Sequence, residues 1–385
     1  MGDVASSDPF RSTLRLFLSV DLVGSTAFKQ SNQLAFDAEK KASLDKPVEP
    51  WLSPIAHFYR EVERLFAKHW AQYNERTLDT LEWPAGDAPQ LWKSAGDELL
   101  YVKVLKDHRE ALTCIFCWVE TLREYRLALR SKYPALDIKS AAWIAGFPIT
   151  NTEVIFRSSV EDGGASSDDD DAIFSNLKLL HEYYDDPSDK RLTRDFIGPS
   201  IDTGFRVCSL ASPRKLVITI DLMLLIVHAI RTVPPELNLD KNDFHYHGRE
   251  TLKGVFGGFG YPIFWLDMAH SSELERVEDR LLNLSPRNTD DIKKFCEQFI
   301  AENPNRIIVP YISGNGDKYF DNPPPHHNER LRALKSYYEN EANRRLEETN
   351  SAKSTNEDGA DADEDRLLQL IKMLLSGTPG DPEHK

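Results

Sequence analysis

The chain has 385 residues, of which 41% are hydrophobic and 28% charged, and its net charge at pH 7 is -15. This length suffices for one large packed domain with extensions, and the negative charge argues against a surface that binds nucleic acid or an anionic membrane. The polar first nine residues do not resemble a signal peptide, and the longest apolar run, Leu216–Ile230, contains Asp221 and His228 and is too short to span a bilayer. We therefore expect a cytoplasmic protein without a membrane segment.

The first informative segment is residues 15–26, Arg-Leu-Phe-Leu-Ser-Val-Asp-Leu-Val-Gly-Ser-Thr. Its apolar run predicts a buried strand that ends in a Gly-Ser-Thr turn, so Asp21 lies where the sheet stops. The backbone N–H groups of residues 23–27 then face outward. A carboxylate beside such N–H groups suits a divalent cation that is bound to phosphate.

The next elements are a helix, a hairpin, a second helix and a strand. Apolar residues at helical spacing predict a helix over Trp51–Trp70. Apolar runs on both sides of Ser94-Ala-Gly-Asp97 predict a tight hairpin with Asp97 at its tip. A helix near Asp107–Ser131 and a strand near Ile138–Phe147 follow. This order predicts an α+β fold in which helices cover a mixed sheet.

Residues 157–172 contain Glu-Asp-Gly-Gly-Ala-Ser-Ser and then four aspartates, and this composition predicts a flexible acidic insert. Further along, the pattern predicts a strand over Lys215–Ile220 and a helix over Asp221–Arg231 with Asp221 as its N-cap. Two strands near Phe244–Lys253 and Tyr261–Leu266 then close the sheet.

The last third of the chain is more polar. It predicts a helix over Asn288–Asn303, a short strand over Arg306–Ile312 and a strongly charged helix over Asn328–Glu348. Thr349–Asp365 reads as a disordered acidic linker. Residues 366–385 contain a short amphipathic helix, which docks either on this protein or on another.

Four motifs occur in a fixed order along the chain. They are Phe17-x-x-x-Asp21-x-x-Gly24-Ser25-Thr26, Lys93-x-x-Gly96-Asp97, Asp195-x-x-Gly198-x-x-x-Asp202-x-x-x-Arg206 and Leu252-Lys253-Gly254. Together they resemble the catalytic domain of class III nucleotidyl cyclases, and the resemblance covers residues 12–268. The Gly-Pro-Ser-Ile-Asp-x-Gly-Phe-Arg part of the third motif resembles the bacterial pyrimidine cyclases of the Pycsar anti-phage system.

This resemblance implies a ferredoxin-type βαββαβ core, an α/β sandwich of the α+β class with a C-terminal extension. The expected organisation is a flexible N-terminus (1–11), the catalytic domain (12–268), a mostly helical extension (269–348), the acidic linker (349–365) and the tail (366–385).

The resemblance also implies roles for individual residues. Two Mg²⁺ or Mn²⁺ ions are expected on Asp21, the backbone carbonyl of Leu22, and Asp97. The triphosphate is expected on the N–H groups of Val23, Gly24, Ser25 and Thr26. Arg206 would stabilise the transition state, Asp202 would contact the ribose, and Lys93 and Asp195 would contact the base.

The expected assembly is a homodimer. Lys93 and Asp97 lie too close on one hairpin to face the base and the metal ions of the same site. In the resembled family, a head-to-tail dimer divides these roles between two chains. By this resemblance Lys93, Asp195, Asp202 and Arg206 act across the interface.

The residues alone do not determine which base of the nucleoside triphosphate is bound. Lys93 and Asp195 supply one donor and one acceptor, which suit adenine, cytosine or uracil. The Pycsar resemblance favours a pyrimidine, and UTP before CTP. The expected enzyme is thus a phosphorus–oxygen lyase that makes 3′,5′-cyclic UMP and diphosphate, and the cyclic nucleotide would activate a downstream effector in anti-phage defence. The alternatives are a cytidylate cyclase and then an adenylate cyclase of ordinary signalling.

The chain departs from the family pattern at three positions. Asp202 replaces an asparagine, Val255 replaces a lysine that contacts the triphosphate, and the arginine of the Ile138–Phe147 strand has no counterpart. Lys139 is close to that arginine's place but is expected to face the opposite side of the strand. Other phosphate contacts are therefore expected from Lys29, Arg194 and Lys253.

Overall fold

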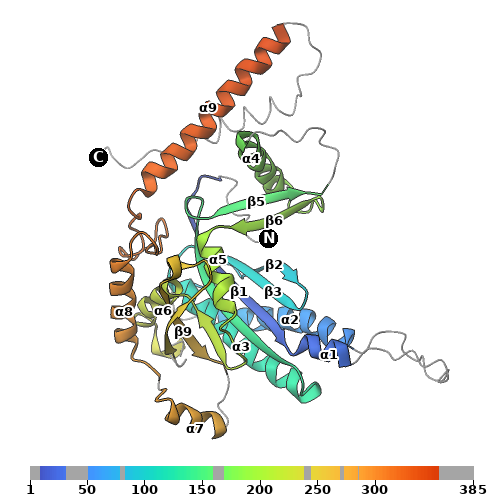
Figure 1. Ribbon diagram of the computed structural model, residues 1–385, viewed down its shortest axis with the longest axis vertical. Helices are drawn as coiled ribbons and strands as arrows, with labels where there is room; N and C mark the ends of the chain where they lie inside the picture. The colour runs from blue at the N-terminus through green and yellow to red at the C-terminus, as the bar shows by residue number, and fades with distance from the viewer. Residues whose placement is uncertain are drawn as a thin grey trace, which may run out of the picture. The chain divides into compact units, whose positions relative to one another are not determined.

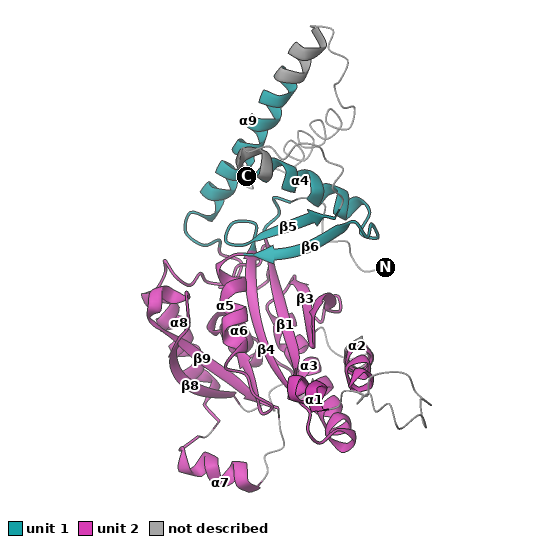
Figure 2. Cartoon of the chain, turned by 45° about the vertical axis from the view of Figure 1, so that its right-hand side comes forward, with its two compact units in different colours: residues 1–12, 147–197, 323–385 teal, residues 13–146, 198–322 magenta. Residues whose placement is uncertain are grey.

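A computed structural model describes residues 9–31, 51–78, 83–158, 169–237, 244–268, 273–284 and 286–354. The chain divides into two compact units, shown in Figure 2. Unit 1 comprises residues 1–12, 147–197 and 323–385, and unit 2 comprises residues 13–146 and 198–322. Among the described residues, no helix is both long and apolar enough to cross a bilayer.

Unit 2 contains a seven-stranded mixed sheet with the strand order β2-β3-β1-β4-β7-β9-β8. Figure 1 labels β1, β2, β3 and β9 of this sheet. The strands are β1 (Thr13–Val23), β2 (Gln90–Ala95), β3 (Glu98–Leu105), β4 (Asp137–Phe147), β7 (Lys215–Ile218), β8 (Phe244–Thr251) and β9 (Gly260–Asp267). β4 and β7 are parallel, whereas β3 is antiparallel to β1 and β2, and β9 is antiparallel to β7 and β8.

The helices of unit 2 are α1 (Ser25–Ser31), α2 (Leu52–Leu78), α3 (Arg109–Lys132), α5 (Pro199–Cys208), α6 (Ile220–Ile230), α7 (Glu273–Leu281) and α8 (Thr289–Glu302), with 3-10 turns η1 (Pro235–Leu237) and η2 (Phe256–Gly258). α3 packs between α2 and α6, and α6 also packs on α8. The segment β1-α2-β2-β3-α3-β4 has βαββαβ order, and its strands lie in the order β4-β1-β3-β2. The predicted α+β fold with a ferredoxin-type core is confirmed.

The two faces of β1 have different neighbours. Leu16, Leu18 and Val20 belong to the main hydrophobic cluster, which includes the residues of α2 and α3 that cover the sheet. Phe17 and Ser19 alternate with them and project to the other face, although both are buried. Burial on both faces explains why this strand reads as a nearly continuous apolar run.

Unit 1 contains a two-stranded antiparallel ribbon and two helices: β5 (Thr152–Arg157), β6 (Leu192–Ile197), α4 (Asp169–Asp185) and α9 (His327–Ser354). One cluster, formed by Ile155, Leu180 and Leu192, joins α4 to the ribbon. A second cluster joins α4 to α9 and to the N-terminal segment, and comprises Phe10, Phe174, Leu177, Tyr338 and Ala342. Unit 1 is therefore assembled from three segments that are distant in sequence.

Some predicted elements differ from the observed ones. α6 begins at Ile220 with Thr219 as N-cap residue, so Asp221 is in the first turn, where its side chain accepts the N–H of Leu222 (2.9 Å). Residues 306–312 form no strand. α9 extends to Ser354, so the first part of the expected linker is helical. Residues 159–168 of the acidic insert and residues 355–385, with the tail helix, lie outside the described residues.

Candidate active site

Two carboxylates are placed at one end of the unit 2 sheet. Asp21 is near the end of β1, where it pairs across the antiparallel ladder with Glu98 of β3. Asp97 lies in the two-residue turn between β2 and β3, as the sequence predicted. The N–H of Leu22 donates to the main-chain oxygen of Asp97 (3.2 Å). This hydrogen bond holds the hairpin tip against the end of β1, so both carboxylates belong to one rigid substructure.

The turn after β1 brings α1 to the same place. Gly24 has φ of 84°, and a Cβ there would lie 2.7 Å from the carbonyl oxygen of Ala135, so this position requires glycine. The chain then enters α1, where the Ser25 hydroxyl donates a hydrogen bond to the Asp97 carboxylate. Lys29, one turn later, has its Nζ 3.5 Å from Asp97 Oδ2. Val23 is half-buried at the end of β1, and Thr26 is exposed on α1.

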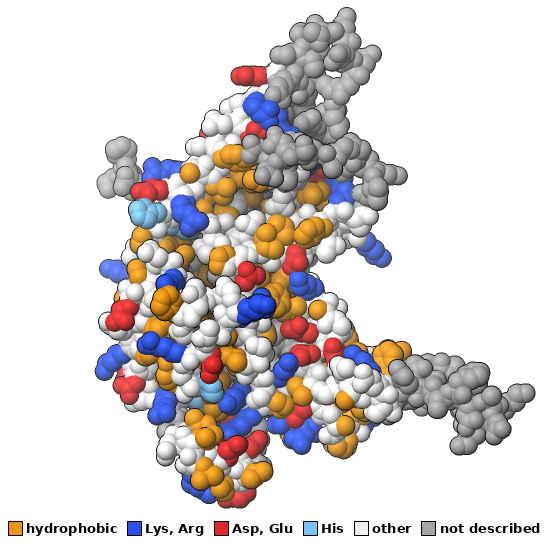
Figure 3. Space-filling view, in the orientation of Figure 1, with side chains coloured by type: hydrophobic (Ala, Val, Ile, Leu, Met, Phe, Trp, Pro, Cys, Tyr) orange, Lys and Arg blue, Asp and Glu red, His pale blue; other side chains and the backbone are white. Residues whose placement is uncertain are grey.

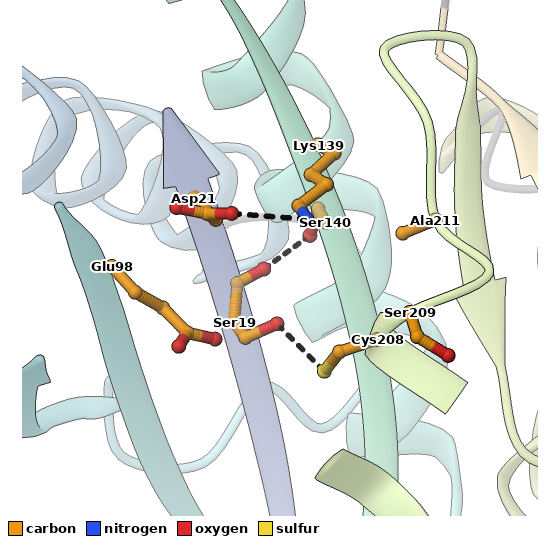
Figure 4. A pocket seen from close by; sticks show the side chains of 8 residues that line it. All are labelled: Ser19, Asp21, Glu98, Lys139, Ser140, Cys208, Ser209 and Ala211. Carbon is orange, nitrogen blue, oxygen red and sulfur yellow. Dashed lines mark hydrogen bonds and ion pairs between the residues drawn. The ribbon is translucent and has the colours of Figure 1, made fainter. Parts of the chain in front are cut away.

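Lys139 lies in the site, and the expectation that it faces away was wrong. Its Nζ is 3.1 Å from Asp21 Oδ2. A dashed line marks this ion pair in Figure 4. The reason is strand alternation: Ile138 is packed in the hydrophobic core beside the helices, so the next residue of β4 projects to the opposite face. That face is the one that carries Asp21.

A pocket of about 120 Å³ adjoins this pair. It is lined by Ser19, Asp21, Glu98, Lys139, Ser140, Cys208, Ser209 and Ala211 (Figure 4). Burial raises the pKa of Asp21; Lys139 opposes this rise and the charge of Asp97 adds to it. Burial also raises the pKa of Glu98, and the neighbouring Asp21 raises it further. Carboxylates that repel one another in a half-buried place favour a bound cation.

The donor set suits a hard divalent ion. Among the described residues, no group of three or more His, Cys, Asp and Glu side chains is arranged to hold a metal ion. Donors for a metal ion at this sheet end would be the carboxylates of Asp21 and Asp97 and the main-chain carbonyl of Leu22. Oxygen donors of this kind match Mg²⁺ and Mn²⁺. Lys139 and Lys29 each neutralise one of these carboxylates in the chain alone.

α5 carries the second group of predicted residues. Asp202 and Arg206 are both exposed and lie one turn apart on this helix. Gly204, between them, allows the helix to approach β4 closely, because a Cβ there would lie 2.3 Å from the Trp143 ring. The position of Arg206 thus depends on close packing of α5 against the sheet.

Lys93 lies beside this helix. Its Nζ is 6.0 Å from the centre of the Phe205 ring, and Phe205 is the residue before Arg206. The structure therefore places Lys93 beside the helix that carries Asp202 and Arg206. Asp21, Asp97, Ser25, Lys29 and Lys139 lie together at the end of β1, and Cys208 and Ser209 at the end of α5 line the pocket that adjoins them.

Asp195 belongs to unit 1. It lies opposite Val154 in the β5–β6 ribbon, and its Oδ1 accepts the N–H of Phe196 (2.9 Å). Arg194, a weak candidate for a phosphate contact, has Nη1 3.7 Å from Glu153 Oε1 within the same unit. Lys253 is exposed in the turn after β8.

Apart from Asp21 and Lys139, the sequence did not reveal the residues of the pocket, among them Ser19, Glu98 and Cys208. Glu98 could have been found, because an antiparallel partner of Asp21 must share its face. Cys208 ends α5, and its Sγ lies 3.4 Å from the Ser19 hydroxyl. Burial raises the pKa of the Cys208 thiol to about 12, so the thiol is neutral at physiological pH.

Comparisons with known proteins give structural likeness only. No family model matches the chain, and no curated protein matches it. Among solved structures, the adenylyl cyclase CyaB from P. aeruginosa is 12% identical with a TM-score of 0.39, and the match covers 68% of this chain and 97% of that one. The guanylyl cyclase Cya2 is 14% identical with a TM-score of 0.35, covering 72% of this chain and 98% of the other.

The guanylate cyclase domain of RhGC from Catenaria anguillulae, solved in complex with GTP, is 12% identical with a TM-score of 0.35 and covers 68% and 100% of the two chains. All three are adenylyl or guanylyl cyclases. Their identities and TM-scores are low, so these comparisons alone assign neither a family nor an activity.

Proposed function

We propose that the chain is a nucleotidyl cyclase that converts a nucleoside triphosphate into a 3′,5′-cyclic nucleotide and diphosphate. The observation that carries the proposal is the placement of Asp21 and Asp97. Two adjacent antiparallel strands deliver them to one sheet end, and the hydrogen bond from Leu22 to Asp97 holds them there. The four cyclase-like motifs of the sequence contain both residues.

Cyclisation requires the ribose 3′-oxygen to attack the α-phosphorus while diphosphate leaves from the opposite side. Two Mg²⁺ or Mn²⁺ ions would supply charge neutralisation at the attacking and leaving oxygens. Asp21, Asp97 and the carbonyl of Leu22 would hold these ions. The N–H groups of residues 23–26 would bind the triphosphate at the start of α1.

Lys29 and Lys139 would both contact the triphosphate in this reaction. The sequence indicated this role for Lys29 but not for Lys139. In the chain alone they are paired with the metal carboxylates at 3.1 Å and 3.5 Å. When cations replace them there, both ammonium groups become available to the triphosphate. Lys139 and Lys29 thus compensate for the lysine that Val255 replaces.

Arg206 and Lys93 would act on the substrate held by the other chain of a homodimer. Arg206 would donate to the α-phosphoryl oxygens in the transition state, and Asp202 would accept from the ribose. Lys93 and Asp195 would read the base. The resemblance of the four sequence motifs to class III cyclases supports this division between two chains.

The proposed substrate is UTP, with CTP as the alternative and ATP after it. The cyclic pyrimidine nucleotide would act as a second messenger that activates an effector in anti-phage defence. The support for this choice is the Gly-Pro-Ser-Ile-Asp-x-Gly-Phe-Arg segment at residues 198–206. On the face of unit 2 drawn in Figure 3, acidic and basic side chains are interspersed, which suits a small substrate better than a nucleic-acid strand.

The test is to incubate the full chain with each of the four triphosphates and Mn²⁺, and to identify products by mass spectrometry. We expect cyclic UMP from wild type and none from Asp21→Ala or Asp97→Ala, which should remain folded because neither side chain is in the core. Ser209→Ala, at the far side of the same pocket, is the matched control. A near wild-type rate in either aspartate variant would refute the metal assignment.

A further inference from the structure

A β-bulge in β2 places two consecutive side chains on one face of the sheet. Leu91 pairs with Tyr101 and Lys93 pairs with Leu100, so the register shifts by one residue at Trp92. In a regular strand, neighbouring residues project to opposite faces, whereas a bulge redirects one of them. Trp92 and Lys93 both project to the face that also carries Phe17.

Below these residues lies a buried aromatic layer. Phe17 and Trp143 are each fully buried and stack with their ring centres 5.6 Å apart and their planes 7° apart. Trp92 contacts Phe17 edge-on at 5.4 Å, and Phe205 contacts Trp143 at 5.5 Å. Trp92 and Phe205 therefore have rigid support, with ring centres 6.3 Å apart.

The Lys93 ammonium is held by these two rings. Its Nζ lies 4.2 Å from the Trp92 ring centre and 6.0 Å from that of Phe205. An ammonium over an indole face is attracted by the ring quadrupole, so its reach into solvent is limited. Phe205 remains 37% exposed, which leaves an aromatic surface open beside the ammonium.

We propose that Trp92 and Phe205 form a wall that sets the size of the base which Lys93 can reach, and so select a pyrimidine over a purine. This inference rests on the proposed function, in which Lys93 contacts the base. Because the ammonium is held 4.2 Å from the Trp92 ring centre, a base that it contacts must lie beside the Trp92 and Phe205 rings. The second ring of a purine requires the space that Trp92 occupies.

The experiment compares wild type with Trp92→Ala and Trp92→Leu, which retains bulk if the alanine variant folds poorly. For each protein, kcat/KM is measured for UTP, CTP, ATP and GTP, together with equilibrium binding of the corresponding 3′-deoxynucleotides. We expect both variants to raise the purine-to-pyrimidine ratio of kcat/KM by about tenfold or more, because loss of one aromatic contact to a base has an effect of that size. Phe205→Ala should act in the same direction.

Leu91→Ala is the matched control, because Leu91 is 47% exposed on the same strand but pairs with Tyr101 and so faces the helices. It should leave the ratio unchanged. If folded Trp92 variants lost kcat/KM equally for all four nucleotides, or lost the dimer without a change in the purine-to-pyrimidine ratio, the proposal that Trp92 and Phe205 select the base would be refuted. If wild type cyclises no nucleotide, the proposed function fails, and the binding ratios of the same variants still decide whether the wall selects the base.

Discussion

The replacement Lys139→Met tests the link between the lysine and the metal carboxylate. It removes the ammonium that lies 3.1 Å from Asp21 and keeps the aliphatic part of the side chain. In the proposed site, Lys139 and a divalent cation compete for the Asp21 carboxylate of the nucleotide-free protein. Loss of the ammonium should therefore make Mn²⁺ bind more tightly, although the same change should weaken binding of the triphosphate.

The magnitude follows from the exposure of the pair, which is 33% for the Lys139 side chain and 28% for that of Asp21. An exposed ion pair contributes about 0.2–1 kcal/mol and a hydrogen bond to a buried charge about 1.5–3 kcal/mol, so this half-buried pair contributes about 1–2 kcal/mol. The dissociation constant for Mn²⁺ should thus fall about 5- to 30-fold. The KM for the nucleotide should rise by a similar factor.

Mn²⁺ binding is measured by calorimetry on the nucleotide-free protein at mildly alkaline pH, because loss of Lys139 raises the pKa of Asp21 further. Lys68→Met is the matched control: Lys68 lies 2.8 Å from Glu124 on the surface of unit 2, with similar exposure. Unchanged or weaker Mn²⁺ binding in Lys139→Met would show that Asp21 is not a ligand for which Lys139 competes.

Three further predictions concern other parts of unit 2. Mixing inactive Asp97→Ala with inactive Arg206→Ala should restore about a quarter of wild-type activity after subunit exchange, since one site of each mixed dimer is intact; no recovery would argue that each site comes from one chain. Gly204→Ala should cost about 1–3 kcal/mol of stability, because its Cβ meets the Trp143 ring at 2.3 Å, and an unchanged melting temperature would contradict this packing. Burial raises the pKa of Asp221 from 3.8 to about 6, so the native state retains a proton that the unfolded chain has lost, and stability falls as pH rises across that window. Asp221→Asn should remove this slope in urea unfolding measured on both sides of the window, and an identical slope would refute it.

The elements that the sequence predicted best have a pattern that depends on few neighbours. β1 could be predicted because it is buried on both faces. The β2–β3 hairpin could be predicted because a Gly-Asp turn separates two apolar runs. The apolar segment 306–312 was predicted as a strand, yet Ile307 and Ile312 are buried against the core without a ladder. Burial alone did not distinguish the two outcomes, and Pro310 also lacks the N–H that a ladder requires.

The placement of the two candidate carboxylates at one sheet end could be predicted from the sequence, whereas the placement of Lys139 could not. The face to which Lys139 projects depends on the register of β4, which Ile138 fixes by packing beside the helices. The bulge at Trp92 depends on the pairing of β2 with β3 and leaves no local sequence signal. β5, α4 and β6 were not predicted. Phe174 and Leu177 of α4 have their apolar partners near both ends of the chain, and the cluster of Ile155, Leu180 and Leu192 joins elements that lie on both sides of the acidic insert in the sequence.

The composition of unit 1 has a consequence for how the protein is made. Phe174 and Leu177 of α4 have their partners in Phe10 and in Tyr338 and Ala342 of α9. During synthesis, all the residues of unit 2 precede α9, so unit 2 can complete its core first. Until α9 is made, Phe174 and Leu177 of α4 lack their partners from that helix. A shortened chain that ends before residue 323 would keep that face uncovered permanently. A fragment designed to isolate unit 2 should therefore also replace residues 147–197 with a short linker.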